Sequence, residues 1–135
     1  MTSNFKHITY DTDSEMAYIY LTNPSTYKIS STEELPCNDD IMIDFGKDCP
    51  VIGVELEGEA AAKVATLSTY LSYKKIVSAD GAVHYSLTLT NQGVVKTVQY
   101  PGVSVVSFLF ADEDCKDFIG ISVAESKWYT EEFFV

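Results

Sequence analysis

Hydrophobic and polar residues alternate along most of the chain, and this pattern predicts β-strands. Ile8 and Tyr10 alternate with polar neighbours, and Ile19 and Leu21 do the same after a short acidic turn. A period of two residues places successive side chains on opposite faces of a strand. Residues 8–23 are therefore expected to form a strand, a turn rich in aspartate and serine, and a second strand.

A later segment repeats this order of features. Residues 76–91 match residues 8–23 without a gap: Ile76 takes the place of Ile8, and both segments end in Leu-Thr-Asn. The turn of the later segment contains Asp-Gly, which is a strong signal for a β-hairpin. Since self-similarity within a chain indicates a repeated structural unit, the chain is predicted to hold two copies of one β-rich unit.

The second part of each copy supports the repeat. Residues 41–56 and 105–123 each contain an apolar strand that ends in Phe, an acidic turn with one cysteine, and a strand with Ile-Gly. Gly53 and Gly120 take the same place in the last strand, where glycine often marks a bulge or a close approach of another backbone. The cysteine turn is therefore interpreted as part of a hairpin template rather than as a chemical site.

Between the copies, the spacing of apolar residues changes to the helical period. The segment GEAAAKVATLSTYLS carries apolar residues at i, i+4, i+7 and i+11 and has no proline, which predicts an amphipathic helix. After the second copy, the chain ends in an aromatic tail, which is expected to form either a short helix or a strand and to pack on the core. If it were exposed, a tail of this size would mark an interface.

Together these patterns predict an α+β fold that is mostly β. It consists of two tandem antiparallel β-meander repeats with one amphipathic helix between them, because hairpins joined by short turns pair with their neighbours. The whole chain, residues 1–135, is expected to form a single domain. Its expected parts are repeats at about 7–57 and 75–124, a linking helix at about 58–72 and the aromatic tail at 127–135.

The first copy resembles the YuzE-like family of small uncharacterised proteins (domain of unknown function 2283). The residues that carry the resemblance are Tyr10-Asp11, Ala17-Tyr18-Ile19 and Leu21, then Ile41, Ile43, Asp44 and Phe45, and finally the run from Val51 to Leu56. The resemblance covers about residues 7–60, with a longer insert at 23–38 and a second copy as the departures. It implies a small meandering sheet followed by a helix, and it implies no established activity.

Charge narrows the classes of partner. The formal net charge is −11, and the sequence contains no arginine. Arginine is the usual bidentate ligand of phosphate and guanine, so a nucleic-acid binder is disfavoured. No run approaches the ~20 apolar residues that a membrane helix needs, and the N-terminus has no signal-peptide pattern. The chain is therefore expected to be cytoplasmic, with an acidic surface that serves solubility or attracts a basic partner.

Few residues are spaced for metal binding or for cysteine chemistry. Cys37, Cys49 and Cys115 are odd in number and form no Cys-x-x-Cys, so reduced thiols are expected. His7 and His84 have no metal-ligand spacing, whereas hydrolytic zinc normally takes three protein ligands. We therefore expect no metal.

The sequence also argues against catalysis. Asp44 and Glu55 lie on strands that the repeat makes neighbours, and two facing carboxylates can perform acid–base chemistry when burial raises one pKa. Their counterparts in the second copy are Leu109 and Ser122, so the pair is not kept. No phosphate-binding glycine motif and no Gly-x-Ser-x-Gly is present. We expect no enzyme and no cofactor.

Three classes of function remain. The first is a non-enzymatic acidic protein-binding module, such as an inhibitor or immunity-type protein that occupies a basic partner surface; tyrosines and acids suit this role. The others are a self-associating protein, possible as a homodimer through edge strands, and a small-ligand binder with a pocket between the repeats. The residues expected to contact a basic partner are Asp11, Asp13, Glu15, Tyr18, Tyr20, Asp39, Asp40, Asp112, Glu113 and Asp114.

Overall fold

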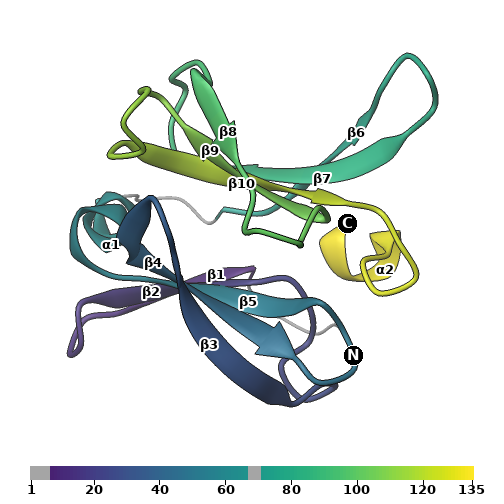
Figure 1. The fold of residues 1–135 in the computed structure, drawn as a ribbon, viewed down its shortest axis with the longest axis horizontal. Helices are drawn as coiled ribbons and strands as arrows, with labels where there is room; N and C mark the ends of the chain where they lie inside the picture. Colours follow the sequence, from purple (N-terminus) through teal and green to yellow (C-terminus); the bar gives the residue numbers. More distant parts are fainter. Residues whose placement is uncertain (1–6, 67–70) are drawn as a thin grey trace.

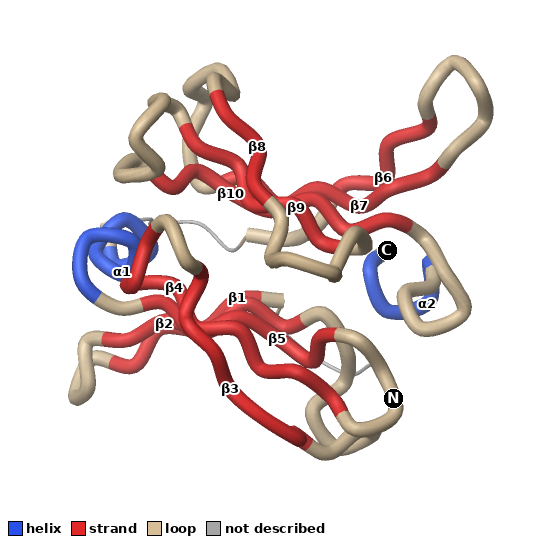
Figure 2. The backbone as a smooth tube through the Cα atoms, viewed as in Figure 1, coloured by secondary structure: helices blue, strands red, loops and turns tan. Residues whose placement is uncertain are grey.

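Two five-stranded antiparallel sheets face each other in the structure, a computed structural model that describes residues 7–66 and 71–135 (Figure 1). The first sheet contains β1 (Ile8–Asp11), β2 (Met16–Tyr20), β3 (Ile29–Leu35), β4 (Asn38–Gly46) and β5 (Val51–Leu56). The second contains β6 (Lys74–Val77), β7 (Val83–Thr88), β8 (Lys96–Val98), β9 (Val106–Phe110) and β10 (Phe118–Ala124). The helices α1 (Gly58–Ala65) and α2 (Glu131–Phe134) lie at opposite ends of this sandwich (Figure 2).

Both sheets have the same topology, which confirms the tandem repeat. The strand orders are β1-β2-β5-β4-β3 and β6-β7-β10-β9-β8. In each sheet the last three strands in chain order form a meander, β3-β4-β5 in the first and β8-β9-β10 in the second. The second strand of the first hairpin, β2 or β7, pairs with the last strand of that meander, β5 or β10. The long connection from β2 to β3 therefore returns the chain to the far edge of its sheet, and the connection from β7 to β8 does the same.

The glycines predicted to mark a bulge do so in both copies. Asp44 lies opposite Gly53 while the next residue of β4 lies opposite Val51, so one residue of β5 is left over. The same shift occurs on β10, where Gly120 and Phe118 face successive residues of β9. The shared bulge confirms that residues 41–56 and 105–123 are equivalent elements.

Close packing explains why these positions hold glycine. A Cβ atom on Gly53 would lie 2.3 Å from the ring of Tyr18, which crosses the outer face of β5. A Cβ atom on Gly120 would lie 2.3 Å from the backbone oxygen of Leu87 on the paired strand. Neither distance leaves room for a methyl group, so both glycines are required by the approach of a neighbouring strand.

One detail of the sequence match is wrong: Ile76 is not the counterpart of Ile8. Ile8 pairs with Ile19, whereas Ile76 pairs with His84, nearer the turn of its hairpin. The residue before Lys74 is Tyr73, which is 5% exposed and fills the place of Ile8, while Ile76 is 42% exposed. The second hairpin is longer, and an alignment without gaps cannot detect residues added on both sides of a turn.

Helix α1 is shorter than the sequence predicts. It ends at Ala65, and the hydroxyl of Thr66 donates a hydrogen bond of 2.8 Å to the backbone oxygen of Lys63. The rest of the predicted helix falls on residues 67–70, which lie outside the described residues, and on residues 71–72, which are not helical. The described part presents its apolar stripe to the core, as the spacing predicts.

The aromatic tail forms a short helix, which is the first of the two structures expected from the sequence, and it packs on the core. Phe134 is fully buried and stacks on Tyr85, with ring centroids 4.6 Å apart and planes 8° from parallel. The Tyr129 hydroxyl donates to the backbone oxygen of Val51 at 2.6 Å and accepts from its backbone nitrogen at 2.7 Å. The last residues of the chain therefore hold the second repeat to the first.

Candidate functional site

A surface hollow at the α1 end of the sandwich collects acidic side chains from both repeats. It has a volume of about 570 Å³ and is called the acidic hollow below. Its lining residues are Glu34, Pro36, Cys37, Asn38, Asp39, Asp40, Glu59, Asp114, Cys115 and Lys116. Five of these are carboxylates and one is a lysine, so the hollow carries net negative charge.

The turn between β3 and β4 forms one wall of the acidic hollow. The Asn38 side chain donates a hydrogen bond of 2.8 Å to the backbone oxygen of Cys115, in the β9–β10 turn of the other repeat. Its amide oxygen accepts from the backbone nitrogen of Asp40 at 2.9 Å. Asn38 therefore stabilises its own turn and also attaches this turn to the second repeat. These two contacts hold Asp39 and Asp40 in position.

Asp40 also organises the start of α1. Its carboxylate accepts a hydrogen bond of 3.3 Å from the backbone nitrogen of Glu59, within the first helical turn. A Cβ atom on Gly58, whose φ is +57°, would lie 2.6 Å from the oxygens of this carboxylate. An acid at a helix N-terminus is favourable because it pairs with unsatisfied N–H groups and with the helix dipole. Asp40 therefore serves the fold as well as the charge of the hollow.

The β9–β10 turn forms the opposite wall and is held by its own carboxylate. Asp112 accepts hydrogen bonds from the backbone nitrogens of Lys116, at 3.1 Å, and Asp117, at 2.9 Å. Lys63 of α1 forms an ion pair with Asp117 and donates to the backbone oxygen of Phe118 at 3.0 Å. Partial burial lowers the pKa of Lys63, although nearby acids oppose this shift. These contacts tie α1 to the second repeat.

The predicted partner-binding residues separate into groups in three dimensions. Asp39, Asp40 and Asp114 line the acidic hollow, and Asp112 supports its wall. The acids of the β1–β2 turn are exposed but do not line it, although this turn lies at the same left-hand end of the molecule (Figure 1). Glu34 and Glu59 complete the hollow and were missed, because no sequence pattern links a strand end to a helix start in space.

The two predicted tyrosines lie on the outer face of the first sheet. Tyr18 donates a hydrogen bond of 2.6 Å to Asp44, which also accepts one of 2.6 Å from the Thr32 hydroxyl. Burial, and then Asp44, hold the pKa of Tyr18 well above its usual value. Burial, and then Asp44, also raise the pKa of Glu55. The Tyr18 hydroxyl is thus engaged within the protein, and the Tyr20 ring packs beside the Tyr18 ring, with centroids 4.7 Å apart and planes tilted by 49°.

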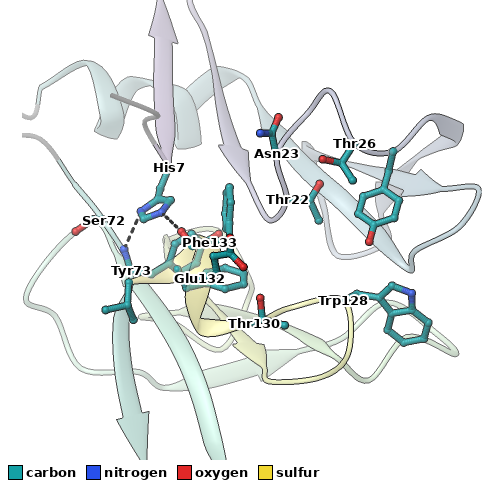
Figure 3. A pocket seen from close by; sticks show the side chains of 13 residues that line it. His7, Thr22, Asn23, Thr26, Ser72, Tyr73, Trp128, Thr130, Glu132 and Phe133 are labelled. Carbon is teal, nitrogen blue, oxygen red and sulfur yellow. Dashed lines mark hydrogen bonds between the residues drawn. The ribbon is translucent and has the colours of Figure 1, made fainter. Parts of the chain in front are cut away.

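A second cavity lies at the other end of the sandwich, between the two repeats, and is called the inter-repeat cavity (Figure 3). Its volume is about 870 Å³, and the loop after β2, the start of β6 and the C-terminal tail surround it. Trp128 and Tyr27 supply aromatic surface, and Glu132 is the acid in its lining. Thr22 also lines it, and its buried hydroxyl oxygen has no hydrogen-bond partner among the described residues.

His7 joins three segments at the wall of this cavity. Its Nε2 lies 2.8 Å from the backbone oxygen of Phe133, which can only accept, so Nε2 carries the proton. Its Nδ1 accepts from the backbone nitrogen of Tyr73 at 3.4 Å. Both ring nitrogens are therefore satisfied by a neutral imidazole. This residue, 8% exposed, holds β1, the start of β6 and α2 together.

Among residues 7–66 and 71–135, no group of three or more histidine, cysteine or acidic side chains is placed to hold a metal ion. None of the described helices has the length and apolar character needed to cross a membrane.

Comparison with known proteins extends the sequence resemblance. A family model described as "Protein of unknown function (DUF2283)" matches residues 7–59, which span the first repeat and the start of α1. An "Uncharacterized protein YuzE" of Bacillus subtilis (strain 168) is 33% identical over 125 residues, covering 93% of this chain and 92% of the relative. That coverage includes both repeats, so the second repeat is shared with this relative. No solved structure matches.

Proposed function

Since this chain belongs to the YuzE-like DUF2283 family, whose function is unknown, we propose a function from its own surface: it is a non-enzymatic module that binds a basic protein surface through the acidic hollow. An inhibitor or immunity-type protein acting in the cytoplasm fits this role. The observation that carries the proposal is the gathering of five carboxylates, from both repeats, around one hollow.

Electrostatics supports a basic partner. Like charges held close together repel each other. The net charge of the chain is −11, and Lys116 is the one cationic side chain among the described residues that line the hollow, so most of this repulsion is not neutralised within the protein. A lysine- or arginine-rich surface would relieve the repulsion, and complementary potentials also speed association. The turns that present these acids are fixed by Asn38 and Asp112, so little ordering entropy is lost on binding.

The test compares capture of binding partners at low salt by three versions of the chain. The double variant Asp39→Asn/Asp114→Asn removes two charges from the hollow while keeping the size and shape of the side chains, and it should weaken binding at least tenfold. The control Asp80→Asn removes a charge from the β6–β7 turn, at the far end of the molecule from α1, and should bind like the wild type (Figure 1). Equal binding by all three would contradict the proposal, as would binding that is insensitive to salt.

The inter-repeat cavity supports a second candidate function, the binding of a small molecule. Its volume of about 870 Å³ lies within the usual range of ligand sites, and its lining mixes aromatic rings with hydroxyl groups (Figure 3). A thermal-shift screen against metabolites, followed by Trp128 fluorescence, tests this candidate. A ligand that raises the melting temperature of the wild type but not of Thr22→Val would support it. A screen without any such ligand would count against it.

A further inference from the structure

Two of the three cysteines meet at the acidic hollow although they belong to different repeats. Cys37 lies in the β3–β4 turn and Cys115 in the β9–β10 turn, and both line the hollow. Besides partial burial, the Cys115 thiol contributes to raising the pKa of Cys37, which fits two side chains that line the same small hollow. The side chain of Asn38, the residue after Cys37, donates a hydrogen bond of 2.8 Å to the backbone oxygen of Cys115, so the two cysteine turns are joined directly beside these residues.

The surroundings hold both thiols in place. The Cys37 turn has only two residues between the ends of β3 and β4, and Leu35, just before it, is 1% exposed. Cys115 is 2% exposed, and its turn is closed by the Asp112 carboxylate. A bond between the sulfurs would therefore constrain the unfolded chain strongly while ordering little that is not already ordered in the folded protein.

We propose that Cys37 and Cys115 form a reversible disulfide that joins the β3–β4 turn of the first repeat to the β9–β10 turn of the second. The oxidant is a low-molecular-weight disulfide. In the first step the Cys37 thiolate attacks one sulfur of the oxidant, forms a mixed disulfide and releases one small thiol. In the second step the Cys115 thiolate attacks the Cys37 sulfur and releases the other. Two protein thiols are oxidised, and one small disulfide is reduced to two thiols.

Exposure sets the order of these steps. Cys37 is exposed and meets the oxidant first, whereas the buried Cys115 is reached through Cys37. The remaining cysteine is elsewhere: Cys49 is buried, and its sulfur lies 3.8 Å from the backbone oxygen of Val51. Partial burial, and then the Cys115 thiol, raise the pKa of Cys37 to about 11. The reactive thiolate is therefore scarce at neutral pH, and exchange proceeds faster in mildly alkaline solution.

The experiment treats the full chain with oxidised glutathione at mildly alkaline pH and measures intact mass and cross-linked peptides. The wild type should lose two hydrogen atoms and yield a peptide that links Cys37 to Cys115. The variant Cys115→Ser should instead keep glutathione on Cys37, because no second thiol displaces it. The variant Cys37→Ser should stay unmodified, since Cys115 is buried. The matched control Cys49→Ser should cross-link like the wild type.

Three results would overturn the proposal: a wild type that retains glutathione as stably as Cys115→Ser, a disulfide-linked dimer through Cys37, or a wild-type cross-linked peptide that joins Cys49 to another cysteine. The wild-type peptide map needs no variant, so a variant that fails to fold does not prevent a decision. Any effect of the disulfide on partner binding rests on the proposed function, whereas the mass measurement does not depend on binding.

Discussion

The surroundings of Asp44 distinguish the two repeats. In the first repeat this 8% exposed carboxylate accepts hydrogen bonds from Tyr18 and Thr32. In the second repeat Leu109 takes its place, opposite Gly120 as Asp44 is opposite Gly53. The registers also make Thr97, opposite Leu109, the counterpart of Thr32. Equivalent strand positions therefore carry a polar cluster in one copy and an apolar residue in the other.

This difference provides a matched pair of substitutions. Thr32→Val removes one donor from Asp44 and should lower the free energy of unfolding by about 1–3 kcal/mol, the cost of leaving a buried acceptor short of a partner. Thr97→Val should change it by less than about 0.5 kcal/mol, since no carboxylate faces that position. Urea unfolding of both variants measures the difference. Equal losses would mean that the Thr32–Asp44 bond contributes nothing of its own.

The Cys37 thiol leads to a pH-dependent prediction. Because its pKa is raised to about 11, most of the thiol is protonated near neutrality, and the thiolate fraction rises about tenfold per pH unit until that pKa is approached. Alkylation of Cys37 by iodoacetamide should follow the same slope, as followed by peptide mass spectrometry. A rate that levels off near neutral pH would contradict the raised pKa.

At the scale of elements, the bulge after each cysteine turn depends on a glycine. A Cβ on Gly120 would meet the backbone of β7, which cannot move aside, whereas one on Gly53 would meet the Tyr18 side chain. Gly120→Ala should therefore destabilise the protein by roughly 2–4 kcal/mol and Gly53→Ala by about 1–3 kcal/mol, as overpacking in tight sites does. Both losses are measurable by urea unfolding.

Gly93 is the control for these two substitutions. It lies in the loop between β7 and β8, where an added Cβ would have no neighbour within 4 Å. Gly93→Ala should change stability by less than about 0.5 kcal/mol. If all three substitutions cost the same, the loss reflects the general effect of replacing glycine and not the close approach of strands at the bulge.

At the scale of the whole molecule, the C-terminal tail connects the two repeats. Tyr129→Phe removes the hydroxyl that bonds both the backbone nitrogen and the backbone oxygen of Val51, and it should lower the free energy of unfolding by about 2–4 kcal/mol. Tyr85→Phe is the control, because that hydroxyl bonds the exposed Glu125 carboxylate. It should cost about 0.5–1.5 kcal/mol, as measured by urea unfolding.

Thermal unfolding should show that the two repeats unfold together. The transitions followed by Trp128 fluorescence and by far-UV circular dichroism should coincide, since one core includes both repeats. Two separate transitions would mean that the repeats unfold independently.

Local sequence patterns were enough to predict the strands, the two-copy organisation and the glycine bulge, because alternation and turn residues act between near neighbours in the chain. The alternation of Ile41 and Ile43 is present in their own segment, and both are buried as it requires. Local patterns were insufficient where residues were added on both sides of a turn, as the shift from Ile76 to Tyr73 shows.

Which turns lie next to each other depends on packing in three dimensions. The acidic hollow exists because two sheets pack face to face and bring the β3–β4 turn, the start of α1 and the β9–β10 turn to one end. No spacing in the sequence relates Glu34 to Glu59 or Cys37 to Cys115, since these contacts depend on the summed shapes of a core made by both repeats. Cys115, which the sequence repeat matches with Cys49 as a turn residue, is brought to the same hollow as Cys37 only by this packing.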